Sequence, residues 1–110
     1  MLTTPCETAS KYIIPAIRAN ISKALVKNKY TQKSIAKILG VTQPAVSKYL
    51  SDKYEGKLKY IVNDNNIKKY SEQIVEMIIN GRPEEDIRLS ILGSSAKVLK
   101  ENPNAFIWGD

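Results

Sequence analysis

The chain has 110 residues of ordinary globular composition, with 43% hydrophobic residues, 25% charged residues and a formal net charge of +6. It has no histidine and one cysteine, which excludes an intrachain disulfide and leaves no pattern of catalytic or metal-binding side chains. No apolar run reaches the roughly eighteen residues that span a bilayer, and the N-terminus lacks a signal-peptide pattern. We therefore expect a cytoplasmic protein that is not an enzyme, is not a membrane protein and needs no cofactor.

The positive charge is concentrated in the N-terminal part of the chain. Residues 1–62 carry ten lysines and one arginine against three acidic residues, a balance of +8. Residues 63–110 carry four lysines and two arginines against eight acidic residues, a balance of −2. This asymmetry is typical of a polyanion-binding module joined to an assembly segment, although lysine-rich surfaces also occur on merely soluble proteins.

The N-terminal segment predicts a long helix interrupted by proline. The run Thr-Pro-Cys-Glu at residues 4–7 combines an N-cap, a first-turn proline and a capping-box carboxylate. Pro15 removes a backbone donor and crowds the turn before it. We expect a kink there, or two abutting helices at residues 4–14 and 15–29.

Residues 31–51 read TQKSIAKILGVTQPAVSKYLS and predict a helix, a tight turn and a second helix. Thr31 and Thr42 stand where N-caps are needed, and Pro44 falls in a first turn, where its missing donor costs little. Gly40 stands where the first helix must end in a left-handed turn. The spacing predicts these inward apolar positions: Ile35, Ala36, Leu39, Val41, Val46, Tyr49 and Leu50.

The C-terminal half predicts two further helices after a polar loop. Residues 58–62 show a weak alternation of apolar and polar side chains, which predicts a short strand or an extended linker. Helical periodicity returns at Ile67, and Gly81 and Pro83 close that helix. A second helix begins at Pro83, and we expect Gly93 to break it in two.

The central stretch resembles the helix-turn-helix of the phage repressor and Cro superfamily. The matching features are the small Ala36 where the helices cross, Gly40 in the turn and the apolar positions around them. The N-terminal sequence at residues 4–7 and 15–19 also resembles the N-terminal sequence of a group of archaeal predicted transcriptional regulators. Some members of that group carry a C-terminal thiamine-related domain, for which this chain is too short, so the resemblance implies DNA binding alone.

In that superfamily the second motif helix lies in the major groove with its first turn against the base edges. Carried over by position, the resemblance implies the following base-contacting residues: Gln43, Pro44, Ala45, Ser47 and Lys48. The resemblance also implies that Gln32 and the start of its helix bind a phosphate. Together with residues chosen for charge and reach, the expected phosphate contacts are Thr31, Gln32, Lys33, Lys37, Lys53 and Lys57.

We expect an all-α fold with a helix-turn-helix module at residues 1–56 and a helical assembly segment at 57–110 of the same domain. One module touches only a few base pairs, so selectivity favours a homodimer. The expected dimerisation residues are Ile74, Ile78, Ile91 and Trp108. The function predicted is a DNA-binding transcriptional regulator, most simply a dimeric repressor that binds double-stranded DNA with the helix at 42–51. The alternatives are a helix-turn-helix module that binds a protein partner and an antitoxin-type autoregulator.

Overall fold

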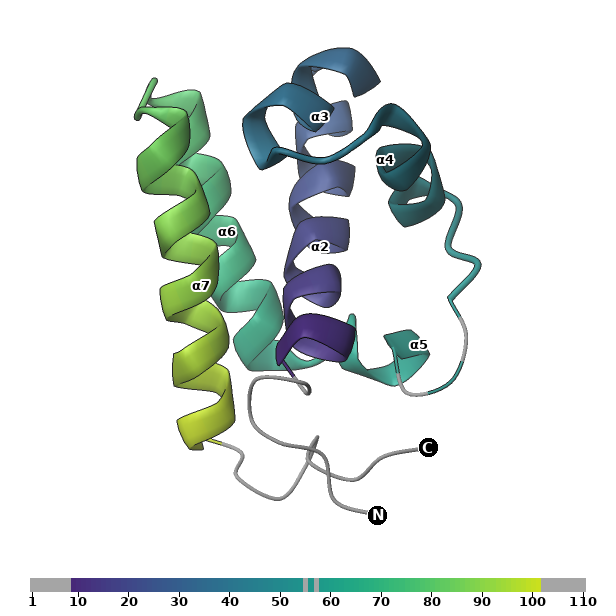
Figure 1. The fold of residues 1–110 in the computed structure, drawn as a ribbon, viewed down its shortest axis with the longest axis vertical. Helices are drawn as coiled ribbons and strands as arrows, with labels where there is room; N and C mark the ends of the chain where they lie inside the picture. Colours follow the sequence, from purple (N-terminus) through teal and green to yellow (C-terminus); the bar gives the residue numbers. More distant parts are fainter. Residues whose placement is uncertain (1–8, 55, 57, 102–110) are drawn as a thin grey trace.

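The computed structural model describes residues 9–101 except 55 and 57. Within those ranges every element is helical, which confirms the predicted all-α fold (Figure 1). The elements are η1 (Ala9–Ile13), α2 (Ile14–Lys27), α3 (Gln32–Leu39), α4 (Gln43–Leu50), α5 (Leu58–Ile61), α6 (Asn65–Ile79) and α7 (Glu84–Glu101). None of the described helices is long and apolar enough to cross a lipid bilayer.

Helix α2 is the centre around which the other helices pack. It contacts α6 and α7 on one side and α3 and α4 on the other, and Figure 1 shows α6 and α7 running side by side along it. Ile17 and Ile21 of α2 are fully buried, as are Ile35 of α3, Val46 of α4 and Ile67 of α6. The helix-turn-helix and the C-terminal helices therefore share one hydrophobic core.

The N-terminal segment is continuous with α2 in the described residues. A π-helical turn, Ala9–Ile13, leads directly into α2, and Pro15 lies in the first turn of α2. A regular α-helical turn would press the proline ring against the carbonyl of Lys11, and the wider π turn is the usual accommodation. The predicted interruption at Pro15 is thus a widened turn rather than a break, while residues 1–8 lie outside the described part.

Residues 58–61 form the short helix α5, so the predicted strand or extended linker is wrong. Leu58, Ile61 and Val62 follow the three- and four-residue spacing of a helix, and the latter two are buried. The Val62 carbonyl accepts a hydrogen bond of 2.9 Å from the side-chain amide of Asn20 on α2. This contact across 42 residues ties the end of α5 to the central helix.

Helix α7 runs unbroken through Gly93, which corrects the expected break. Ile91 and Val98 are buried on either side of the glycine and hold both halves of α7 against the core. Ser95 is also buried, and its hydroxyl donates to the Leu92 carbonyl at 2.7 Å, so it needs no other partner. Packing outweighs the helix cost of one glycine, which is about 1 kcal/mol.

This geometry predicts that Gly93→Ala stabilises the protein by about 0.5–1 kcal/mol, because alanine is the better helix former. A Cβ at position 93 meets no atom within 4 Å, so no packing cost opposes the gain. Urea unfolding measures the change. The matched control is Gly81→Ala, which is equally open but has φ +78, and there we expect a loss of stability. A loss at Gly93 would contradict an open, continuous α7.

Three residues expected at a dimer surface lie inside the protomer's own core. Ile74 and Ile78 of α6 are 2% and 7% exposed, and Ile91 of α7 is 3% exposed. They are covered because α6 packs on both α2 and α7. This corrects their assignment as interface residues, and Trp108 lies outside the described residues.

Candidate functional site

The turn between α3 and α4 has the geometry that its sequence predicts. Gly40 adopts φ 71 and ψ 36, the left-handed conformation. Its N–H donates to the Lys37 carbonyl at 3.3 Å, and the Val41 N–H donates to the Ala36 carbonyl at 3.0 Å. These two bonds form a Schellman motif, which satisfies carbonyls that α3 would otherwise leave open. The direction of α4 relative to α3 is thereby defined.

Both helices begin at threonine N-caps. The Thr31 hydroxyl accepts from the Ser34 N–H at 3.1 Å, and the Thr42 hydroxyl accepts from the Ala45 N–H at 3.2 Å. Each threonine has an extended backbone, as an N-cap requires. The Thr31 cap accepts from one backbone N–H group of α3, that of Ser34. The other N–H groups of a helix's first turn point out of its N-terminus, where they bind anions well.

The outward face of α4 presents the side chains predicted to contact bases. Gln43, Pro44, Ser47 and Lys48 are exposed, whereas Ala45 is half-buried. Val46, on the inward side of the same helix, is fully buried. The face therefore projects from a helix that is anchored on its other side.

The predicted phosphate contacts that the structure describes lie on the segments before and after α4, and all of them are exposed. Thr31, Gln32 and Lys33 are exposed at the start of α3, and Lys37 is exposed one turn further along the same face. Lys53 is exposed in the loop after α4, where its N–H donates to the Ser51 hydroxyl at 3.3 Å. Lys57 lies outside the described residues.

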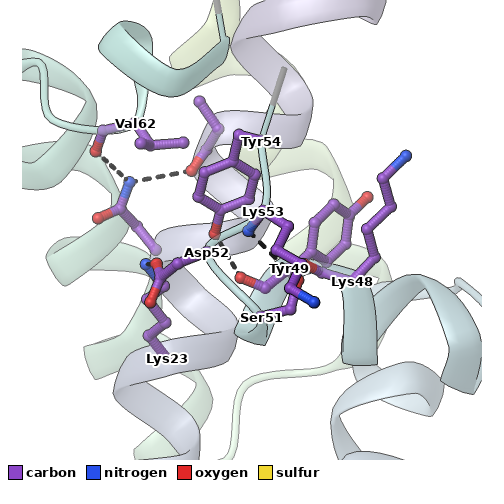
Figure 2. Close-up of polar contacts among 10 residues, drawn as sticks. Lys23, Lys48, Tyr49, Ser51, Asp52, Lys53, Tyr54 and Val62 are labelled. Carbon is purple, nitrogen blue, oxygen red and sulfur yellow. Dashed lines mark hydrogen bonds and ion pairs between the residues drawn. The ribbon is translucent and has the colours of Figure 1, made fainter.

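A cluster that the sequence did not reveal braces the end of α4 against α2. Figure 2 shows the Tyr54 hydroxyl donating to the Tyr49 carbonyl and the Lys23 ammonium paired with Asp52. The same ammonium lies 5.3 Å from the centre of the Tyr54 ring. Asp52 has a positive φ of 60, which folds the chain back toward α2. The residues next to Asp52 do not predict its positive φ. They do not predict its ion pair either, because Lys23 lies 29 residues away in the sequence.

The brace makes stability depend on pH in the alkaline range. Burial raises the pKa of Tyr54 above its ordinary value of 10.0. Burial alone would lower the pKa of Lys23, but hydrogen bonding to Asp52 and the nearby Tyr54 raise it above 10.5. In both cases the folded state favours the protonated form, so this stabilisation is complete below about pH 10 and is lost as pH rises through the folded-state values.

We therefore expect the stability difference between the wild type and Lys23→Met to stay constant up to about pH 10 and to shrink between about pH 10 and pH 12. Urea unfolding at a series of pH values measures it. Lys100→Met, at an exposed lysine of α7, is the control and should show no such change. A difference that stays constant over this range would contradict the role of the Lys23 ammonium.

A second contact missed from the sequence joins α7 to the turn. The Arg88 side chain donates from Nη2 to the Lys37 carbonyl at 3.0 Å, across 51 residues. A Cβ on Gly40 would lie 2.8 Å from Arg88 Nε, so the glycine also makes room for this arginine. No local pattern marks Arg88, because the contact exists only once α7 has packed beside α3.

Residues 21–61 match a family model described as helix-turn-helix. The match covers the second half of α2, both motif helices, the loop and α5, and it supports a Cro/C1-type DNA-binding helix-turn-helix. A search of curated proteins and a search of solved structures each found no match. Within the described residues, no group of three or more Cys, Asp or Glu side chains could hold a metal ion.

Proposed function

We propose that this chain, which carries a DNA-binding helix-turn-helix, is a sequence-specific transcriptional regulator and most simply a dimeric repressor. In this proposal α4 enters the major groove of double-stranded DNA. Gln43 hydrogen-bonds to adenine, and Lys48 donates to guanine O6 and N7. The α3 N-terminus and the exposed lysines bind the phosphate backbone on either side.

The observation that carries the proposal is the two-sided character of α4. The helix is fixed to the core by the fully buried Val46, and its solvent side exposes Lys48, with Gln43 and Ser47 exposed at the edges of that side. A helix that must read bases needs both properties, since a loosely held helix would lose its register in the groove. The preceding turn and both caps add to this rigidity.

The direct test is selection of bound sequences from random duplex DNA by the full chain. We expect enrichment of one short motif repeated with two-fold symmetry, its half-sites separated by about one helical turn. Failure to enrich any motif over the starting pool would contradict sequence-specific reading. Enrichment of a single unrepeated motif would contradict the dimer while leaving base reading in place.

The alternative class, a helix-turn-helix that binds a protein partner, predicts a different salt dependence. Binding to duplex DNA releases counterions, so the logarithm of the association constant falls with the logarithm of salt concentration, by about 0.9 for each phosphate contacted. Four or five contacts from the exposed lysines and the α3 N-terminus correspond to a slope of about −4. A slope near zero would favour the protein-interaction alternative.

A dimer must use side chains other than the three core isoleucines. Among the described residues, Leu89 of α7 is 59% exposed and Ile79 of α6 is 50% exposed. We assign the dimer surface to this outer side of α6 and α7, away from the exposed face of α4. Analytical ultracentrifugation of the wild type and Leu89→Glu tests the assignment: we expect a dimer that the charge converts to a monomer. A wild-type monomer at micromolar concentration would contradict it.

A further inference from the structure

A pocket of about 220 Å³ lies where α2, the end of α3 and α7 meet. It is outside the face of α4 assigned to base contacts. Two arginines, Arg18 of α2 and Arg88 of α7, line it beside Gly40. The remaining described lining is aliphatic and consists of Ile14, Leu39, Ile91 and Leu92. The pocket thus combines an apolar wall with two cationic groups.

Arg18 is the first unusual feature of this pocket. Its Nε is buried and has no hydrogen-bond partner among the described residues. Arg18 also forms no ion pair with a described residue. The side chain as a whole is half-buried, so a ligand in the pocket can reach its guanidinium and give the buried Nε a hydrogen-bond partner.

Arg88 is the second cationic group, and it is held in place. One nitrogen donates to the Lys37 carbonyl, which fixes the guanidinium against Gly40. An arginine has five N–H donors, so most of its donor capacity is left after this bond. No carboxylate of the described residues lines the pocket, so the charges of both arginines are not neutralised there.

We propose that this pocket binds a small organic carboxylate with a compact apolar body. The carboxylate accepts hydrogen bonds from the arginines, for which the planar guanidinium is well suited. The apolar body packs on the aliphatic wall, as in most small-molecule sites, where a few polar groups fix the ligand's orientation. This site is separate from the proposed DNA contacts and does not depend on them.

The test uses sodium benzoate as the probe and benzamide as its uncharged counterpart of nearly the same shape. Both are titrated into the full nitrogen-15-labelled chain at an ionic strength held constant with chloride, and amide shifts are followed by NMR. We expect saturable shifts at Gly40, Arg88 and Leu92 with benzoate, and an affinity at least about 10-fold lower for benzamide.

Arg18→Gln should weaken benzoate binding by about 10-fold, because it removes the charged donor. The control is Arg82→Gln, at an exposed arginine that pairs with Asp86 and does not line the pocket, and it should leave the affinity unchanged. If Arg18→Gln does not fold, Arg88→Gln provides the same test from the other side of the pocket.

Three results would overturn the proposal. The first is equal affinity for benzoate and benzamide, and the second is unchanged affinity in the arginine variants. The third is a set of shifts that inorganic phosphate reproduces at the same residues with equal affinity, since the apolar body would then contribute nothing. The measurement contains no DNA, so its failure is distinguishable from failure of the proposed function.

Discussion

Gly40→Ala should lower the free energy of unfolding by about 2–3 kcal/mol. The left-handed conformation at φ 71 costs a non-glycine residue about 1–2 kcal/mol. The added Cβ would also stand 2.8 Å from Arg88 Nε. Because that atom belongs to a flexible side chain, Arg88 can move aside, but it then gives up its hydrogen bond to the Lys37 carbonyl, worth about 1 kcal/mol. Urea unfolding followed by circular dichroism measures the sum.

The two contributions can be separated with variants that the chain itself offers. Gly81→Ala carries the left-handed cost alone, because φ is 78 and nothing lies within 4 Å of the added Cβ. In an Arg88→Ala background, Gly40→Ala should cost no more than Gly81→Ala does in the wild type. Equal losses at the two glycines in the wild-type background would contradict the close approach of Arg88 to the turn.

The second large effect concerns DNA. Gln43→Ala or Lys48→Ala should weaken binding to the selected site by about 1–3 kcal/mol, or roughly 5- to 150-fold, and relax the preference at one base pair. Both side chains are exposed on α4 and are not needed by the core, so the folded state should survive. Fluorescence anisotropy with cognate and scrambled duplexes measures the affinities.

Matched controls distinguish base reading from general charge and surface effects. Lys100→Ala, near the end of α7 that lies farthest from α3 in Figure 1, removes the same charge away from the proposed interface. Gln73→Ala removes an exposed amide from α6. Neither should change the affinity measurably. If Lys48→Ala weakened binding to cognate and scrambled DNA equally, Lys48 would be a phosphate contact and not a base contact.

The features that the sequence predicted well are those decided within a few residues. An N-cap threonine satisfies amides two or three positions away, and a glycine ends a helix through its own backbone angles. Thr31, Gly40 and Thr42 therefore mark the motif helices almost to the residue. Asp64 likewise caps α6 through the Asn66 and Ile67 amides, two and three positions away.

Errors arose where packing over long distances outweighed a local preference. Gly93 and its neighbouring serines favour a break, but Ile91 and Val98 are buried on the same continuous helix. The stripe of Ile74 and Ile78 correctly indicated a helix that buries one face. Periodicity says nothing of which surface covers that face, and the covering surface is the chain's own α2 and α7.

The sequence by itself therefore determined the helix-turn-helix, its caps, its turn and the side chains on its outward face, because each depends on contacts between near neighbours. Only the tertiary structure decided that the C-terminal helices complete the protomer's core, that Lys23 and Asp52 brace the end of α4, and that Arg88 reaches the turn. Those contacts join residues 29 and 51 positions apart, and their partners are chosen by how the helices pack on α2, which no short stretch of sequence encodes.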